Sequence, residues 1–180
     1  MKKLLLASAL ALGISSGSVA LSGSHIEAQA KSYDMKSTLA SALKKGTFPN
    51  EKGKVGMTYT TLSKKVPLGS MDFSGNILYY YPKNSYDPYT FNKKNLSGKS
   101  KVQSITRTYN YFISKSSINK YFGKPIKSAN QGYGLGSYIY VSGKHYIAVT
   151  LYSEDNYNST FITVGTKKHV TSAYNNYTRY

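Results

Sequence analysis

The stretch covering residues 113–165 constrains the fold more than any other part of this chain. It opens with ISKSSINKYFGKP, which carries the start and stop signals of a short helix. The hydroxyl of Ser114 or Ser116 can cap the first turn by accepting a hydrogen bond from a free backbone N–H. Gly123 suits the left-handed position after a helix, and Pro125 cannot continue the hydrogen-bond ladder. The sequence therefore predicts one short helix. Three residues share its apolar face: Ile118, Tyr121 and Phe122.

Three runs rich in aromatic and β-branched residues follow this helix. They read SYIYV, HYIAVTLY and TFITVG, and the short polar segments SGK and SEDNYNS separate them. Such runs predict an antiparallel meander of three strands. Because side chains alternate between the two faces of a strand, Ile147, Val149 and Leu151 share one face of the middle run. We expect this aliphatic face to pack on the helices and the opposite face to be aromatic and polar.

The first half of the chain shows a weaker version of the same order. Residues 32–45 predict a helix that Asp34 can cap, although its thin apolar stripe predicts only light docking. The segment GMTYTTLSKKVPLG, residues 56–69, resembles the helix of the second half. Strand-like runs then follow at 77–82, 89–92 and 101–112.

A helix followed by three strands thus occurs twice, in possible repeat units 56–112 and 113–165. Two imperfect copies leave open whether this is a true internal repeat. Six such strands could join into one antiparallel sheet with short helices on one face. The predicted fold class is therefore α+β.

Both ends of the chain read differently from the middle. Residues 1–30 have the pattern of a secretory signal peptide: Lys2 and Lys3, an apolar run and the cleavage-site sequence AQA. A membrane-spanning helix is the weaker alternative, because SSGS interrupts the apolar run too early. We expect a secreted protein, extracellular or loosely held at the cell surface, with one domain at 31–165. Residues 166–180 look like a flexible basic tail.

Charge is the strongest compositional signal. The formal net charge is +17, and removing the expected signal with Lys2, Lys3 and Glu27 leaves +16. An excess of this size favours an anionic partner such as extracellular DNA or RNA or an anionic cell-wall polymer. The alternative is a lysine surface that only keeps the protein soluble. The absence of cysteine excludes a disulfide framework and a cysteine-linked lipid anchor.

Signs of catalysis are weak. The chain has no cysteine nucleophile, no HExxH, no GxSxG and no phosphate-binding loop. His145 reads as an exposed turn residue and His169 lies in the expected tail, while Glu154 and Asp155 fall in a predicted hairpin loop. We therefore expect a protein that is not an enzyme and uses no cofactor and no metal.

Lysines interleaved with tyrosines are the remaining functional signal. A lysine neutralises phosphate without reading base sequence, and a tyrosine ring can stack on a base or contact a partner. Strand tyrosines are, however, also ordinary core material. The candidate polyanion-binding residues are Lys93, Lys94, Lys99, Lys101, Arg107, Lys115, Lys120, Lys124, Lys127, Lys167 and Lys168. The candidate stacking or partner face consists of Tyr109, Tyr111, Tyr138 and Tyr140.

The segments FISKSSINKYFGKPIK, YIYVSGKHYIAVTLY and ITVG, within residues 112–165, resemble the C-terminal half of the immunodominant staphylococcal antigen B family. The resemblance implies an extracellular, non-enzymatic protein that binds nucleic acid without sequence preference. It implies no catalytic residues.

The helix, the GKP end and the meander also resemble the repeating unit of β-lactamase-inhibitor-like domains. That resemblance implies a concave sheet offered to a protein partner. The rival hypothesis is therefore a secreted inhibitor or host-interaction protein that grips its partner with a tyrosine-rich sheet face. A surface antigen without a specific ligand is a third reading.

Overall fold

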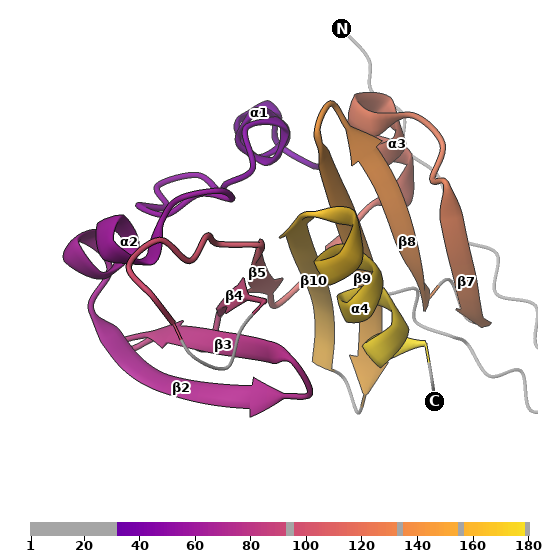
Figure 1. Ribbon diagram of the computed structural model, residues 1–180. Coiled ribbons are helices and arrows are strands. Elements are labelled where there is room, and N and C mark those ends of the chain that lie inside the picture. Colours follow the sequence, from indigo (N-terminus) through magenta and orange to yellow (C-terminus); the bar gives the residue numbers. More distant parts are fainter. Residues whose placement is uncertain (1–31, 93–95, 133–134, 155–156, 179–180) are drawn as a thin grey trace, which may run out of the picture.

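The computed structural model describes residues 32–92, 96–132, 135–154 and 157–178 (Figure 1). The expected signal at 1–30 lies outside these ranges. The fold is α+β. The elements, in chain order, are β1 Ser32–Tyr33, α1 Ser37–Lys44, α2 Tyr59–Lys65, β2 Leu68–Ser74, β3 Ile77–Pro82, β4 Tyr89–Phe91, β5 Ser104–Tyr109, β6 Phe112–Ile113, α3 Lys115–Phe122, β7 Lys127–Gly132, β8 Leu135–Ser142, β9 His145–Glu154, β10 Tyr157–Gly165 and α4 Lys167–Tyr177.

One large antiparallel sheet organises the molecule. Within the described ranges it holds eight strands in the order β2-β3-β4-β5-β10-β9-β8-β7, and β1 pairs with β6 in a separate parallel ribbon. The sequence predicted six of the eight strands. The two missing ones, β2 and β7, lie at the two edges of the sheet. All seven residues of β2 are exposed, so this strand lacks the alternation of buried and exposed positions that marks a half-buried strand.

The two halves of the sheet repeat the same element order. The first half runs α2-β2-β3-β4-β5 and the second runs α3-β7-β8-β9-β10. The halves meet at the antiparallel pairing of β5 with β10, where Arg107 lies opposite Ile162. Each expected unit of a helix and three strands therefore contains a fourth strand, which comes directly after its helix.

The helices that open the two halves have similar N-termini. In α2 the side chain of Thr58 accepts a hydrogen bond from the backbone N–H of Thr61, and in α3 the side chain of Ser114 accepts one from Ser117. Gly123 ends α3 with a positive φ of 75°, a conformation in which glycine carries no side-chain penalty. The predicted cap at Ser114 and the end of the helix at Gly123 are confirmed, but the ψ of −160° at Gly123 lies outside the left-handed helical region that was predicted.

The first segment differs from the prediction. The expected helix at 32–45 begins only at Ser37, and its N-cap residue Lys36 makes no side-chain capping bond. Asp34 instead accepts a hydrogen bond of 2.9 Å from the hydroxyl of Ser114. The backbone N–H of Met35 donates to Ser117 Oγ at 2.8 Å. The chain is thus tied to α3 before it enters α1.

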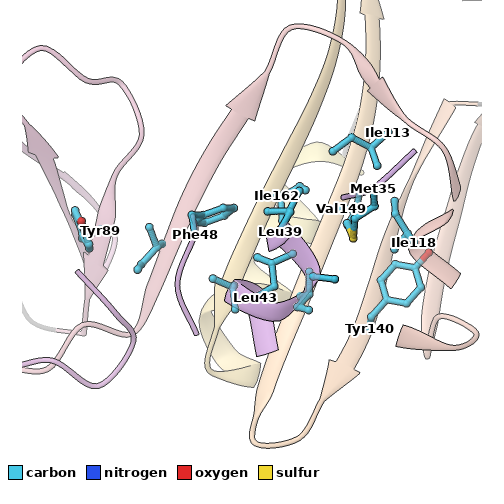
Figure 2. Packing of buried hydrophobic residues seen from close by; sticks show 14 of the residues in the cluster. Met35, Leu39, Leu43, Phe48, Tyr89, Ile113, Ile118, Tyr140, Val149 and Ile162 are labelled. Carbon is cyan, nitrogen blue, oxygen red and sulfur yellow. The ribbon is translucent and has the colours of Figure 1, made fainter. Parts of the chain in front are cut away.

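The main core lies between the sheet and the helices α1, α2 and α3. The predicted inward face of β9 is confirmed, because Ile147, Val149 and Leu151 are all buried in this core. Leu39 and Leu43 of α1 are buried in it as well, so α1 does not dock lightly (Figure 2). Burying one such leucine side chain stabilises the fold by about 2 kcal/mol.

Helix α4 replaces the expected flexible tail. Residues 167–177 form a helix, and Val170 and Tyr174 are buried against Ile139 and Ala148. These two strand residues point away from the main core, since their neighbours Tyr140 and Ile147 point into it. The helices therefore cover both faces of the sheet, which corrects the expectation of helices on one face. Figure 1 shows α4 in front of β9 and β10.

Candidate functional site

The lysines form an uncompensated positive surface. Every lysine in the described part of the chain is exposed. Both ion pairs found among the described residues belong to Arg107, and two of the few carboxylates, Glu51 and Asp87, are used in them. No described lysine has a carboxylate partner, so these charges face solvent and any anion in it.

Two of the predicted lysines lie at an open pocket between β4 and β5. Lys99 and Lys101 line this pocket of about 310 Å³ together with polar side chains. The other lining residues are Asn92, Ser97, Ser100 and Gln103. The predicted Lys93 and Lys94 lie outside the described residues.

The start of α4 is fastened beside this pocket. The backbone N–H of Thr166 donates to the carbonyl of Gln103 at 2.9 Å, and His169 Nε2 lies 2.5 Å from Asn92 Oδ1. These contacts bring two sequence segments with lysines together where β5 begins and β10 ends. We call this surface the basic end. It comprises Lys99, Lys101, Lys167 and Lys168.

The four lysines around α3 do not form one surface. Lys115 Nζ lies 4.3 Å from the centre of the Tyr138 ring, on the face of the sheet that carries the main core. Lys127 belongs to β7, and its Nζ lies 4.5 Å from the ring of Tyr174 in α4, on the opposite face. Lys120 and Lys124 are exposed on and just after α3. The expected cluster is therefore divided between the two faces.

Arg107 is already paired within the protein, which argues against its predicted role in binding a polyanion. Its Nη2 lies 2.8 Å from Glu51 Oε2, and its Nη1 donates to the carbonyl of Pro49 at 3.1 Å. Asp87 is a second, longer partner at 3.9 Å, and the guanidinium lies 4.9 Å from the centre of the Phe48 ring. The two carboxylates therefore offset the charge of the guanidinium.

Two ionisable groups near Arg107, Tyr89 and Asp87, have raised pKa values. Tyr89 donates a hydrogen bond to Glu51 Oε1. Burial, and then this bond to a carboxylate, raise the pKa of Tyr89 strongly. Burial also raises the pKa of Asp87, although the backbone N–H of Thr108 and the charge of Arg107 oppose that change. The cluster therefore holds a buried phenol and two carboxylates around one arginine.

Two of the four predicted face tyrosines lie in the core. Tyr138 and Tyr140 are 6% and 0% exposed, and the hydroxyl of Tyr140 donates to Asn119 Oδ1 at 3.0 Å. They cannot stack on a base or touch a partner. Ile139, which lies between Tyr138 and Tyr140 and points to the opposite face, is buried as well, so both faces of β8 are covered at this point. The next residue on that opposite face, Val141, is exposed.

The other two predicted tyrosines line a cleft with Arg107. Tyr109 and Tyr111 have ring centres 5.5 Å apart, and Tyr111 lies 5.1 Å from Tyr33. The cleft has a volume of about 700 Å³, and α1 forms its other wall. We call it the aromatic cleft. Burial raises the pKa of Tyr109 to about 12.

His145 and His169 are both buried, contrary to the expectation of an exposed turn and a loose tail. Burial and then the nearby charge of Lys144 lower the pKa of His145, whose Nε2 has no hydrogen-bond partner in the described part of the chain. Burial and then Lys168 lower the pKa of His169 to about 4. Its Nδ1 lies 2.8 Å from Thr90 Oγ1.

The sequence did not predict a groove beside α4. It has a volume of about 330 Å³, and its walls are the outer face of β3, β5 and β10 and one side of α4. We call it the tyrosine–threonine groove. Its lining residues are Ile77, Tyr79, Tyr81, Tyr86, Pro88, Thr90, Ser104, Thr106, Thr108, Phe161, Thr163, His169, Ser172, Ala173 and Asn176. Alternating tyrosines in ILYYYP and alternating hydroxyl residues in SITRT were the available signal.

Two further observations bear on ligands and membranes. The described residues contain no group of three histidine, cysteine, aspartate or glutamate side chains that could hold a metal ion. Among the described helices, none is long and apolar enough to cross a membrane.

Comparisons with known proteins gave little. No protein-family model matches the chain, and no curated protein matches it. Among solved structures, the chain is similar to a DUF4309 family protein, YjgB, from Bacillus subtilis, with a TM-score of 0.46 and 14% identity. The match covers 72% of this chain and 94% of that protein. The resemblance to the staphylococcal antigen family stays a prediction.

Proposed function

We propose that this chain is a secreted, non-enzymatic protein that binds polyanions, foremost extracellular nucleic acid, through exposed lysines. One observation carries the proposal: every described lysine is exposed and none is paired with a carboxylate. Such ammonium groups bind phosphates as point charges and release condensed counterions, which gives affinity without sequence preference. An anionic cell-wall polymer would satisfy the same chemistry.

The basic end is the part of this surface to which we assign the strongest local attraction. It joins Lys99 and Lys101 to the first turn of α4, which contains Lys167 and Lys168 and no acidic residue. The free backbone N–H groups and the helix dipole at that terminus also favour a negative charge. Four ammonium groups and a helix start together suit a phosphate backbone.

The test is binding of the protein to labelled duplex DNA, single-stranded DNA and heparin across a salt series. We expect binding near physiological salt that prefers nucleic acid to heparin. Changing the four lysines of the basic end to glutamate should weaken DNA binding at least about tenfold. It should also reduce the slope of log K against log salt by up to about four.

The matched control reverses four exposed lysines elsewhere, at the ends of α1 and α2. These are Lys44, Lys45, Lys64 and Lys65. This variant has the same net charge as the first. A larger loss of DNA affinity in the first variant therefore measures the effect of where the lysines lie. Equal losses would show diffuse attraction without a basic end. Binding to all three polyanions that vanishes below physiological salt would contradict the function itself.

A second candidate function is recognition of a protein partner at the aromatic cleft. The observation in its favour is that Tyr33 and Tyr111 remain exposed there, beside Tyr109. Tyrosine is enriched in protein interfaces because it combines a large apolar ring with a polar tip. A complex of this kind should tolerate salt. It should be lost in Tyr33→Ala/Tyr111→Ala, which should leave DNA binding unchanged.

A further inference from the structure

The tyrosine–threonine groove lies where α4 stops covering the sheet. Helix α4 packs on β8, β9 and β10, and the first half of the sheet lies beside it (Figure 1). One side of the helix borders the groove with residues at the spacing of a helical face: His169, Ser172, Ala173 and Asn176. The groove therefore has a strand floor and a helix wall, both fixed by the fold.

The lining of this groove carries no formal charge. None of the described residues that border it is lysine, arginine, aspartate or glutamate. On a chain with a net charge of +17, a lining without a single ammonium group is a clear contrast. His169 stays neutral at physiological pH, because burial lowers its pKa to about 4. A polyanion would find no counter-charge here, so the ligand that fits is uncharged.

Aromatic rings form one part of the lining. Tyr79 and Tyr81 alternate along β3 and face the groove with nearly parallel rings, 6.4 Å between centres and 19° between planes. Tyr86 is 96% exposed and borders the same space. The negative face of an aromatic ring attracts the weakly positive C–H groups that a sugar ring presents on its flat side. Phe161 adds a further ring on β10.

Hydroxyl groups form the floor between these rings and α4. Thr106 and Thr163 join their hydroxyls across the β5–β10 pairing at 2.9 Å, and Thr90 and Ser104 join theirs across the β4–β5 pairing at 2.6 Å. Each hydroxyl can donate one hydrogen bond and accept two, so the half-buried Thr106 keeps bonding capacity for a ligand. Ser172 and the amide of Asn176 supply further donors and acceptors from the helix.

We propose that the tyrosine–threonine groove binds an uncharged oligosaccharide. Sugar rings need both features that the groove combines, an aromatic surface for their C–H faces and neutral donors and acceptors for their hydroxyls. The site is separate from the basic end, so this inference does not rest on polyanion binding.

The experiment titrates the isotope-labelled full chain with neutral hexasaccharides of N-acetylglucosamine, β-1,4-glucose and α-1,4-glucose, followed by NMR. We expect at least one to bind saturably, with the same affinity at low and high salt. The amide signals that move should be those of residues around Thr106, Thr163 and Ser172. Tyr79→Ala/Tyr81→Ala should weaken that binding at least about tenfold, the loss expected for one or two aromatic contacts.

Two further variants complete the design. Ala173→Arg places a long charged side chain in the groove and should abolish binding without removing any ring. The matched control Tyr33→Ala/Tyr111→Ala removes two tyrosines from the opposite face and should leave the affinity unchanged. Thermal unfolding of each variant shows that it is folded.

Several outcomes would overturn the proposal. They are no binding by any of the three hexasaccharides, binding that survives both Tyr79→Ala/Tyr81→Ala and Ala173→Arg, or signal changes confined to the aromatic cleft. Self-association through the groove, or capture of an extended peptide there in place of sugar, would overturn it as well. Absence of DNA binding by the wild type near physiological salt would contradict the proposed function but would not affect this result, so the two proposals fail separately.

Discussion

His169 Nδ1 lies 2.8 Å from Thr90 Oγ1, so the last helix is hydrogen-bonded to a strand 79 residues earlier in the chain. The other ring nitrogen is bonded to Asn92. In this arrangement the neutral ring can accept from Thr90 at Nδ1 and donate to Asn92 at Nε2. A protonated ring would need two acceptors and would bring a charge into a buried site.

Stability should therefore depend on pH through His169. Its pKa is lowered from 6.5 to about 4 on folding. Because the unfolded chain takes up the proton first, the contribution of His169 is fully present above about 6.5 and is lost as the pH falls toward about 4. The measurement compares urea unfolding of the wild type and His169→Gln across this range. The stability difference between them should shrink with falling pH, and a constant difference would contradict the prediction.

Arg107 should matter for stability rather than for binding. Arg107→Met leaves Glu51 and Asp87 without their cation, at half-buried positions, and should lower the free energy of unfolding by about 2 kcal/mol. DNA affinity should fall no more than in Lys83→Met, a control that removes one exposed charge and should change stability by less than about 0.5 kcal/mol. A large, specific loss of DNA binding in Arg107→Met would restore its predicted role.

Helix α4 should stabilise the fold. Tyr174→Ala opens a cavity against β8 and should cost about 3 kcal/mol, while Lys167→Ala on the same helix should cost almost nothing. Chemical denaturation of the two variants measures the difference. A flexible tail would make both substitutions neutral.

Tyr140 offers a test of burial against stacking. Tyr140→Phe removes the hydroxyl that donates to Asn119 and should lower stability by about 1 kcal/mol. Nucleic-acid affinity should not change, since the ring has no exposed surface. A parallel measurement of unfolding and of DNA binding distinguishes the two roles, and weaker binding by a fully stable variant would show that the ring reaches a ligand.

Local sequence patterns predicted the buried strands well, because alternation is visible wherever one strand face is buried. Ile147, Val149 and Leu151 of β9 are such a case. The edge strands β2 and β7 carry little buried surface and so little pattern. Helix α4 was not predicted for a related reason. Its segment KKHVTSAYNNY is largely polar, and Val170 and Tyr174 are the residues that anchor it to the sheet.

The candidate sites likewise include features that the sequence can predict and features that it cannot. Exposure of the lysines follows from residue type, because a lysine is rarely buried without a partner. The neutralisation of Arg107 depends on Glu51, 56 residues away, and no local pattern reports such a contact. Likewise, the tyrosine–threonine groove exists only because β3, β5, β10 and α4 meet, and these elements are far apart in sequence.

The pairing of β5 with β10 has a consequence for how the chain folds. Within each half, neighbouring strands follow one another directly along the chain, so their contacts are local and can form quickly. The ladder at the centre joins Ser104 to Gly165 and closes a long loop. We expect docking of the two halves to limit the folding rate. Until the halves dock, β5 and β10 are exposed edge strands. Refolding at high protein concentration should therefore favour exchange of halves between two chains.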